Sequence, residues 1–268
     1  NHHSHVTLDM GQVVFTDTTT MTADGPWQYT LYELSGNKWI NHDVETETGS
    51  GIVPFRYRRK SYVHAIMWSI GLELALLIDD PWRVYLTTDH PNGAPFLTYP
   101  RIISWLMSMN ARERALKRIN RRARARSLLP SIDREYTLYE ITIITRAGQA
   151  KALGLKSKGH LGVGADADIA IYNMNPREID PSRDYKTVRK VFGSATYTIK
   201  DGQIVVRDGE IIRSVSGRTL WVDTGVPLEN VEPDLKRRFR EYWTVEYENY
   251  IIPETYLLAS KPIRIKHD

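Results

Sequence analysis

The chain has 268 residues, no cysteine and a formal net charge of +4 at pH 7. This length allows one barrel-sized domain or two smaller ones, and the lack of cysteine excludes disulfide bonds and iron–sulfur clusters held by thiolates of this chain. No apolar run approaches the roughly 20 residues of a membrane-spanning helix, and no signal-peptide pattern is present, so we expect a cytoplasmic protein without membrane insertion.

The chain begins without an initiator methionine, and His2, His3 and His5 precede a strand-like run over residues 8–15. Closely spaced histidines are typical of zinc sites. We interpret these histidines as loop or strand-entry residues and not as metal ligands. We also expect the polypeptide to be incomplete.

A polar, hydroxyl-rich stretch over residues 18–26 predicts a loop, and it contains Asp24. Loops at the mouth of a barrel build substrate pockets, so this stretch is a possible pocket segment. The alternative is a connection whose hydroxyl groups satisfy its own backbone. Residues 27–57 then form a long, irregular excursion.

Apolar residues recur at helical spacing over residues 63–78, which predicts a helix. This helix carries His64 and Glu73. Residues of these types are more often found at the surface or satisfied within the core than in catalysis.

A short β-branched run over residues 84–88 predicts a buried strand, and it ends abruptly at Asp89, His90 and a Pro-Asn-Gly turn. A carboxylate at the tip of a buried parallel strand is what a site on the C-terminal face of a barrel requires. The alternative is an aspartate that closes a turn or caps the next helix. A helix is expected to begin near Ile102.

Eight basic residues fall within fifteen positions after that helix and are opposed by Glu113 alone. They are Arg112, Arg114, Lys117, Arg118, Arg121, Arg122, Arg124 and Arg126. The run indicates a solvated helix face, a docking surface for an acidic protein subunit, or a nucleic-acid site. Since no aromatic residue is interleaved to stack on bases, nucleic acid is the least favoured of the three.

Residues 137–153 predict a further helix that stops at Gly154. Short alternating runs follow, divided by Asp201-Gly202 and Asp208-Gly209, which are strong hairpin signals. The tail over 231–250 has aromatic residues at helical spacing and predicts an amphipathic docking helix. We therefore expect barrel elements over 1–153, a β-module over 154–230 and a docking tail over 231–268.

Several motifs closely resemble the A-subunit family of formylmethanofuran dehydrogenases, within the amidohydrolase superfamily. The resemblance covers about residues 8–219 and is carried by Gly71-Leu-Glu-Leu-Ala-Leu-Leu-Ile-Asp-Asp-Pro-Trp, by Thr87-Thr-Asp-His-Pro-Asn-Gly-Ala-Pro-Phe, and by Lys158-Gly-His-Leu-Gly-Val-Gly-Ala-Asp-Ala-Asp-Ile. It implies the last part of a (β/α)8 barrel of the metal-dependent hydrolase type with a small β-sandwich module. In that superfamily Asp166 and Asp168 would be structural.

The resemblance also implies a reaction, condensation of formate with the amine of methanofuran or the reverse hydrolysis at a dinuclear zinc site, in CO2 fixation or methanogenesis. Asp89 matches the aspartate that is both metal ligand and proton shuttle, and His90, Asn92 and Asp24 become candidate substrate-binding residues. Most zinc ligands would lie outside these residues, so the chain alone should hold no cofactor and be inactive.

The implied partners are the other dehydrogenase subunits, above all the CO2-reducing pterin subunit, together with formate and methanofuran. Tungsten or molybdenum pterin and iron–sulfur clusters would reside in those subunits. Two alternatives stay open: a stand-alone zinc amidohydrolase of the dihydroorotase or aminoacylase type, and a noncatalytic protein that binds through its basic helix.

Overall fold

The computed structural model describes residues 1–20, 33–34, 36, 53–218, 220–223, 227–242, 246–251 and 262–264. Two compact units are present. The first contains Asn1–Ala152 and Lys156–Arg213, and the second contains Leu153–Leu155 and Ser214–Asp268. The candidate site lies entirely in the first unit.

Two parallel strands, β1 (Leu8–Asp9) and β4 (Val84–Tyr85), position the candidate site, with Leu8 opposite Val84. The pairing continues past both strands, because the Gln12 amide donates to the Thr87 carbonyl at 2.9 Å. Val84 is fully buried and Leu86 is 3% exposed, so apolar burial fixes this edge. The predicted strands are therefore present, although their regular parts are short.

An antiparallel pair follows the first parallel strand, formed by β2 (Asp17–Thr20) and β3 (Val53–Arg56) with Asp17 opposite Arg56. The predicted helix is α2 (Tyr62–Leu77), and the Ser61 hydroxyl caps it by accepting from the His64 amide. Trp68 on α2 is fully buried, with ring centroids 5.5 Å from Phe15 and 5.4 Å from Trp105. These aromatic contacts join α2 to both neighbouring segments of the core.

Several short helical segments follow α2 in the chain, the first of them before β4 and the others after it. They are η2 (Pro81–Arg83), η3 (Phe96–Thr98), α3 (Tyr99–Leu106), α4 (Met109–Leu116), α5 (Arg121–Arg126) and η4 (Leu129–Ser131). The helix predicted over 137–153 consists of α6 (Leu138–Thr142), a π-helical turn η5 (Ile143–Ala147) and α7 (Gly148–Ala152). The Ile144 carbonyl in that π-turn accepts from the Leu86 amide, so the helix is bonded to the strand that leads to Asp89.

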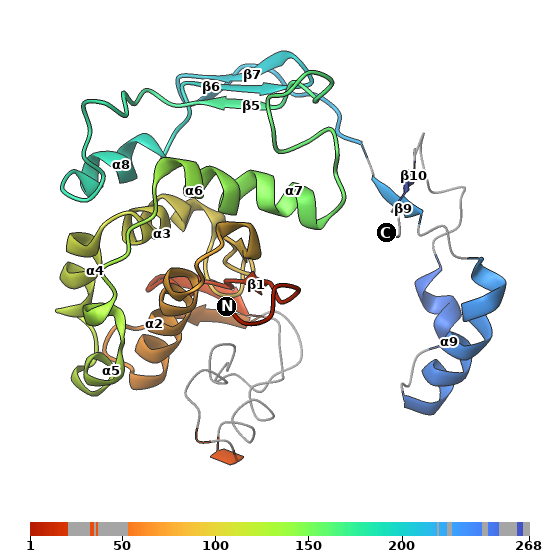
Figure 1. The fold of residues 1–268 in the computed structure, drawn as a ribbon, viewed down its shortest axis with the longest axis horizontal. Coiled ribbons are helices and arrows are strands. Elements are labelled where there is room, and N and C mark those ends of the chain that lie inside the picture. The colour runs from red at the N-terminus through yellow and green to blue at the C-terminus, as the bar shows by residue number, and fades with distance from the viewer. Residues whose placement is uncertain are drawn as a thin grey trace. The chain divides into compact units, whose positions relative to one another are not determined.

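The predicted β-module contains a four-stranded antiparallel sheet in the order β5-β6-β7-β8 (Figure 1). Its elements are β5 (Ile169–Ile171), β6 (Tyr197–Lys200), β7 (Gln203–Arg207) and β8 (Glu210–Ile211), with α8 (Tyr185–Val191) before β6. Both predicted hairpin turns are confirmed, since Asp201 and Asp208 have φ of 48° and 50° and each precedes a left-handed glycine.

The second unit contains the parallel pair β9 (Trp221–Asp223) and β10 (Pro262–Arg264), the helix α9 (Leu228–Tyr242) and the turn η6 (Tyr247–Tyr250). Ion pairs within α9 join Arg237 to Asp234 and Glu241. A helix is thus confirmed in the tail, and its docking role stays a prediction. Among all described helices, none is both long and apolar enough to cross a membrane.

Candidate functional site

Asp89 lies at the carboxyl end of the parallel strand pair, where the chain leaves β4. Its backbone has a φ of 46°, in the left-handed region that asparagine and aspartate enter more readily than most residues. The following His90–Pro91 peptide bond is cis. The carboxylate is exposed at the surface of a turn in which Thr88 and Asn92 are buried. This placement matches the strand-end position predicted from the sequence.

Asn92 holds Asp89 from inside the turn. Its side-chain amide donates to Asp89 Oδ2 at 2.8 Å, and its backbone amide donates to the Asp89 carbonyl at 2.6 Å. Asn92 is only 5% exposed, so its side chain faces the carboxylate and the interior. Among the described residues, Asp89 Oδ1 accepts no hydrogen bond, which leaves one carboxylate oxygen available to a ligand.

Close backbone packing keeps this turn against the first strand. The Gly93 amide donates to the Thr88 carbonyl at 2.9 Å, and the Gly93 carbonyl accepts from Val14 at 3.2 Å. A Cβ at position 93 would lie 2.7 Å from the Thr88 carbonyl oxygen, so only glycine fits without a shift. The Thr18 hydroxyl also donates to the Asn92 carbonyl, at 3.2 Å.

His90 stands at the surface beside the carboxylate. Its Nδ1 accepts from the Phe96 amide at 3.2 Å, and its ring meets the Phe96 ring edge-on with centroids 4.9 Å apart. A neutral imidazole that accepts at Nδ1 carries its proton on Nε2, which leaves a donor for a substrate. Asp24, the other candidate substrate-binding residue, lies outside the described residues.

The donor set at this edge fits a hard or borderline metal ion. Asp89 offers a carboxylate oxygen, a common zinc ligand. Asn92 donates to this carboxylate, and metal-binding carboxylates usually receive such a supporting hydrogen bond. In the same turn, Thr88 Oγ1 and Asn92 Oδ1 are buried without a hydrogen-bond partner. Asp89 is the one described residue that the sequence predicts as a metal ligand, so a dinuclear site needs further ligands from elsewhere.

The N-terminal histidines are at the other end of the strands. His2, His3 and His5 precede β1, and the Arg83 guanidinium, just before β4, donates to the His3 carbonyl at 2.7 Å. Since β1 and β4 are parallel, this contact marks their amino ends, whereas Asp89 follows their carboxyl ends. The arrangement agrees with the interpretation of these histidines as strand-entry residues.

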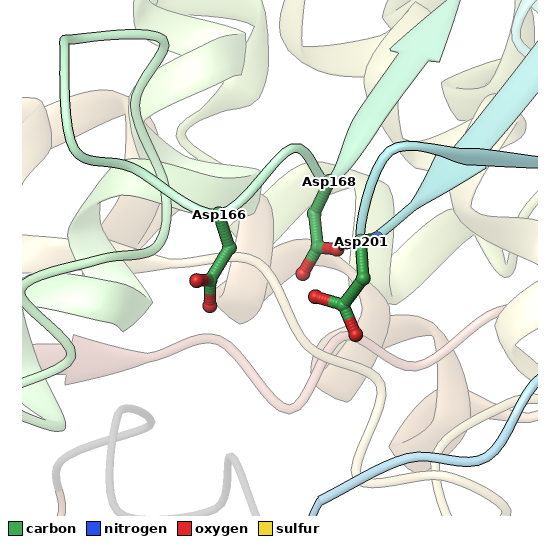
Figure 2. Close-up of side chains that lie close together, drawn as sticks. All are labelled: Asp166, Asp168 and Asp201. Atoms are coloured by element: carbon green, nitrogen blue, oxygen red, sulfur yellow. Dashed lines mark hydrogen bonds between the residues drawn. The ribbon is translucent and has the colours of Figure 1, made fainter.

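Three carboxylates gather in the β-module, where Asp166, Asp168 and Asp201 have ligand atoms within 4.8 Å of one another (Figure 2). Two lysines pair with them: Lys158 Nζ lies 2.7 Å from Asp166 and 2.5 Å from Asp168, and Lys200 Nζ lies 3.0 Å from Asp168 and 2.8 Å from Asp201. Burial raises the pKa of Asp168, but hydrogen bonds from Lys158, the Asp201 amide and Lys200 outweigh it and lower the pKa well below its ordinary value. The cluster therefore ties the loop before β5 to the β6–β7 turn and does not need a metal.

Glu73 and Arg112 are buried structural residues. Glu73 is fully buried and accepts from the Ser69 and Ser127 hydroxyls and from the Leu128 amide. Arg112 is also fully buried, which corrects its assignment to the solvated basic run. Its guanidinium donates to the carbonyls of Trp105, Ile132 and Arg134 at 2.8 to 3.0 Å.

The chain is similar in sequence to several known proteins. Residues 1–206 match the amidohydrolase family. The chain is 48% identical over 270 residues to protein FwdA of Methanocaldococcus jannaschii, covering 99% of this chain and 47% of that protein. It is 43% identical over 227 residues to the A subunit of the formyltransferase/hydrolase complex Fhc of Methylorubrum extorquens, covering 82% of this chain and 38% of that relative.

A solved structure shows the same similarity. The crystal structure of the formyltransferase/hydrolase complex FhcABCD of Methylorubrum extorquens with methylofuran matches 99% of this chain and 48% of that chain, with a TM-score of 0.74 and 34% identity. The chain thus spans about half the length of the relatives it matches. The resemblance inferred from the motifs is confirmed.

Proposed function

The chain belongs to the amidohydrolase family, and on that premise we propose that it is the part of a formyl-transferring subunit that contributes Asp89 to a dinuclear zinc site. The reaction is condensation of formate with the amine of methanofuran, or hydrolysis of formylmethanofuran in the reverse direction. The observation that carries this proposal is the carboxylate of Asp89, exposed at the end of a buried parallel strand and oriented by Asn92. The similarity to FwdA and to the A subunit of Fhc supports it.

The proposal includes the architecture around this edge. β1 and β4 are the last two strands of a (β/α)8 barrel, and the earlier strands and most zinc ligands lie in sequence that the relatives have beyond the matched half. The barrel elements extend over 1–153, the β-sandwich module over 154–230 and the docking tail over 231–268. As an isolated polypeptide the chain would then lack a complete site.

The residues at this edge can perform the proton transfers of the reaction. The metal site, when filled, supplies acidity to water and polarises the formyl oxygen. In hydrolysis, water adds to the formyl carbon, and the Asp89 carboxylate, which Asn92 holds in place, accepts the water proton. Asp89 then delivers this proton to the nitrogen as the C–N bond breaks, so that the amine and formic acid leave, and formic acid loses its own proton to the solvent to give formate. Condensation follows the same steps in reverse.

Neighbouring residues would assist the carboxylate. His90 Nε2–H is available to donate to the substrate beside Asp89, and Asn92 keeps the carboxylate turned outward. Asp24 is retained as a substrate-binding candidate from the sequence. Because formamide formation from free formate is unfavourable in dilute water, the site benefits from formate supplied directly by a neighbouring CO2-reducing subunit.

The proposed partners follow from that need. They are the other subunits of a formylmethanofuran dehydrogenase complex, which would carry the tungsten or molybdenum pterin and the iron–sulfur clusters. This chain has no cysteine to hold such clusters through thiolates. The relative of known structure is part of a complex of several subunits, which supports an assembly of this type.

Zinc content and hydrolysis of formylmethanofuran, measured on the assembled complex and on the 268-residue chain alone, test the proposal. The complex should hold zinc and release formate, and the chain alone should do neither. Two equivalents of zinc on the chain alone, with hydrolysis of formamides, would refute the incomplete-site proposal. Hydrolysis of dihydroorotate without hydrolysis of formylmethanofuran would favour the stand-alone amidohydrolase.

A further inference from the structure

A pocket of about 650 Å³ lies between β2, β3 and the N-terminal end of α2. Its volume falls within the range of roughly 300 to 1,000 Å³ that is typical of small-molecule sites. Phe55, Arg58, Ser61 and His64 line it, together with Thr18 and the ion pair between Arg56 and Asp17. The sequence predicted His64 to be a surface or core residue and indicated no role for Arg58.

His64 presents a buried donor to this pocket. The residue is 8% exposed, its Nδ1 accepts from the Arg58 amide at 2.9 Å, and its ring packs against Phe55 and Tyr57 with centroids 5.2 Å away. Burial, and then the charge of Arg58, lower the pKa of His64, so the ring is neutral near pH 7. Its proton is therefore on Nε2, which has no hydrogen-bond partner among the described residues.

Among the described residues that line the pocket, Arg58 carries a positive charge without a paired carboxylate. Arg56 is paired with Asp17, so these two charges cancel. The Arg58 side chain is exposed and forms no ion pair or hydrogen bond within the described chain. Ser61 begins the 16-residue helix α2, whose first amide groups and dipole also favour an anion. The lining therefore offers a cationic donor, a neutral donor and apolar carbon.

We propose that this pocket binds the carboxylate group of an organic ligand, with the Arg58 guanidinium and His64 Nε2–H as its donors. A carboxylate suits the site better than a phosphate, because one unpaired guanidinium balances one negative charge. The volume exceeds that of a bare carboxylate, and Pro54 and Phe55 provide apolar contact for the attached carbon skeleton. The ligand is therefore an organic acid and not an inorganic anion.

The pocket is connected to the Asp89 turn through Thr18. Thr18 lines the pocket and donates to the carbonyl of Asn92, the residue that orients Asp89. A ligand that orders the pocket therefore contacts a residue bonded to the turn that holds Asp89. The carboxylate site itself does not rest on the proposed function.

Benzoate, titrated into the full chain by isothermal calorimetry, tests the carboxylate site without any formyl substrate. Benzoate should bind and should shift the imidazole nitrogen resonance of His64 Nε2 in NMR spectra, while benzyl alcohol should do neither. The Arg58→Gln variant should bind benzoate about tenfold more weakly, the effect of losing a charge-assisted hydrogen bond. It should fold normally, because the Arg58 side chain is exposed.

Lys60→Gln is the matched control, since Lys60 is also exposed and cationic but does not line the pocket. It should change benzoate affinity by less than about twofold. No benzoate binding, equal binding by wild type and Arg58→Gln, or an unshifted His64 resonance would overturn the proposal. Tighter binding of inorganic phosphate than of benzoate would overturn the assignment to a carboxylate. A failure of formyl transfer would leave all these readouts unaffected.

Discussion

In the turn after β4, the Asn92 side-chain amide donates to Asp89 Oδ2 at 2.8 Å, and the Asn92 backbone amide donates to the Asp89 carbonyl at 2.6 Å. The same residue therefore closes the turn and orients the carboxylate that the turn exposes. Because Asn92 is 5% exposed, it is positioned by the core and not by solvent. The Asp89 carboxylate is directed outward before any ligand binds, so less conformational entropy is lost when it is ordered during the reaction.

Replacing Asn92 with alanine should lower formylmethanofuran hydrolysis by the complex about 10- to 100-fold, the usual effect of losing a partner that orients a metal ligand. The backbone hydrogen bond to Asp89 remains, so the turn should persist. Asn110→Ala, which removes an exposed amide, is the control. A positioning role predicts weaker zinc retention as well as a slower rate; unchanged zinc content and rate in Asn92→Ala would argue against it.

The sequence identified Asp89 because its signal is local: an apolar run, an acidic residue and a turn are adjacent in the chain. The position of Asn92 behind the carboxylate was not predictable in the same way. It depends on the left-handed backbone of Asp89 and on the packing of Gly93 against Thr88, which are tertiary features. The same holds for the pocket at His64, which joins segments from opposite ends of a long connection.

Arg112→Gln should destabilise the fold by about 3 kcal/mol or more, because three backbone carbonyls lose a charged donor. The loss is measurable as a shift of the urea unfolding midpoint. Arg114→Gln, on the exposed face of the same helix, should change stability by less than about 0.5 kcal/mol. Equal effects of the two substitutions would contradict the buried assignment of Arg112.

Composition alone could not separate Arg112 from its basic neighbours. All eight cations are close together in the sequence, and only the path of residues 105–134 around the guanidinium shows which one is internal. In the folded chain, the side chains of the other seven cationic residues are exposed. They are Arg114, Lys117, Arg118, Arg121, Arg122, Arg124 and Arg126.

The exposed cations should bind an acidic partner subunit. Changing Arg121, Arg122 and Arg124 to glutamate should release that partner at moderate salt, as measured by co-purification. Asn120 caps α5, and glutamates in the first turn of a helix are favourable, so α5 should survive the first two changes. Tight binding of DNA or RNA by the wild type, with the steep salt dependence of counterion release, would instead assign this surface to nucleic acid.

The ion pairs of Lys158 and Lys200 with the three aspartates of the β-module should make the free energy of unfolding depend on pH in the acid range. Hydrogen bonds to Lys158, the Asp201 amide and Lys200 lower the pKa of Asp168 in the folded chain despite its burial. A carboxyl group whose pKa is lowered by folding stabilises the protein at pH values above the pKa of the unfolded chain, about 3.9. This stabilisation is lost as the pH falls through the pKa of the folded chain. Asp168→Asn should therefore reduce the unfolding free energy at pH 7, and its difference from wild type should shrink progressively below about pH 4.

Glu210→Gln is the control for this pH series, because Glu210 is exposed in the same β-module and its side chain has no hydrogen bond or ion pair among the described residues. Its stability should follow that of the wild type across the series. If Asp168→Asn were as stable as wild type at pH 7, the cluster would not tie the β-module together. Stabilisation of the wild type by added zinc, lost in Asp168→Asn, would instead favour a metal site at these carboxylates.

Formylmethanofuran hydrolysis by the complex carrying Asp89→Asn tests the central claim most directly. The substitution keeps the size of the side chain and removes the oxygen that accepts and returns the proton. Loss of such a group should lower the rate about 10²- to 10⁴-fold while the circular dichroism spectrum stays that of the wild type. A rate within about threefold of the wild type, well short of the effect expected for a proton shuttle, would contradict the assignment of Asp89 and with it the proposed site.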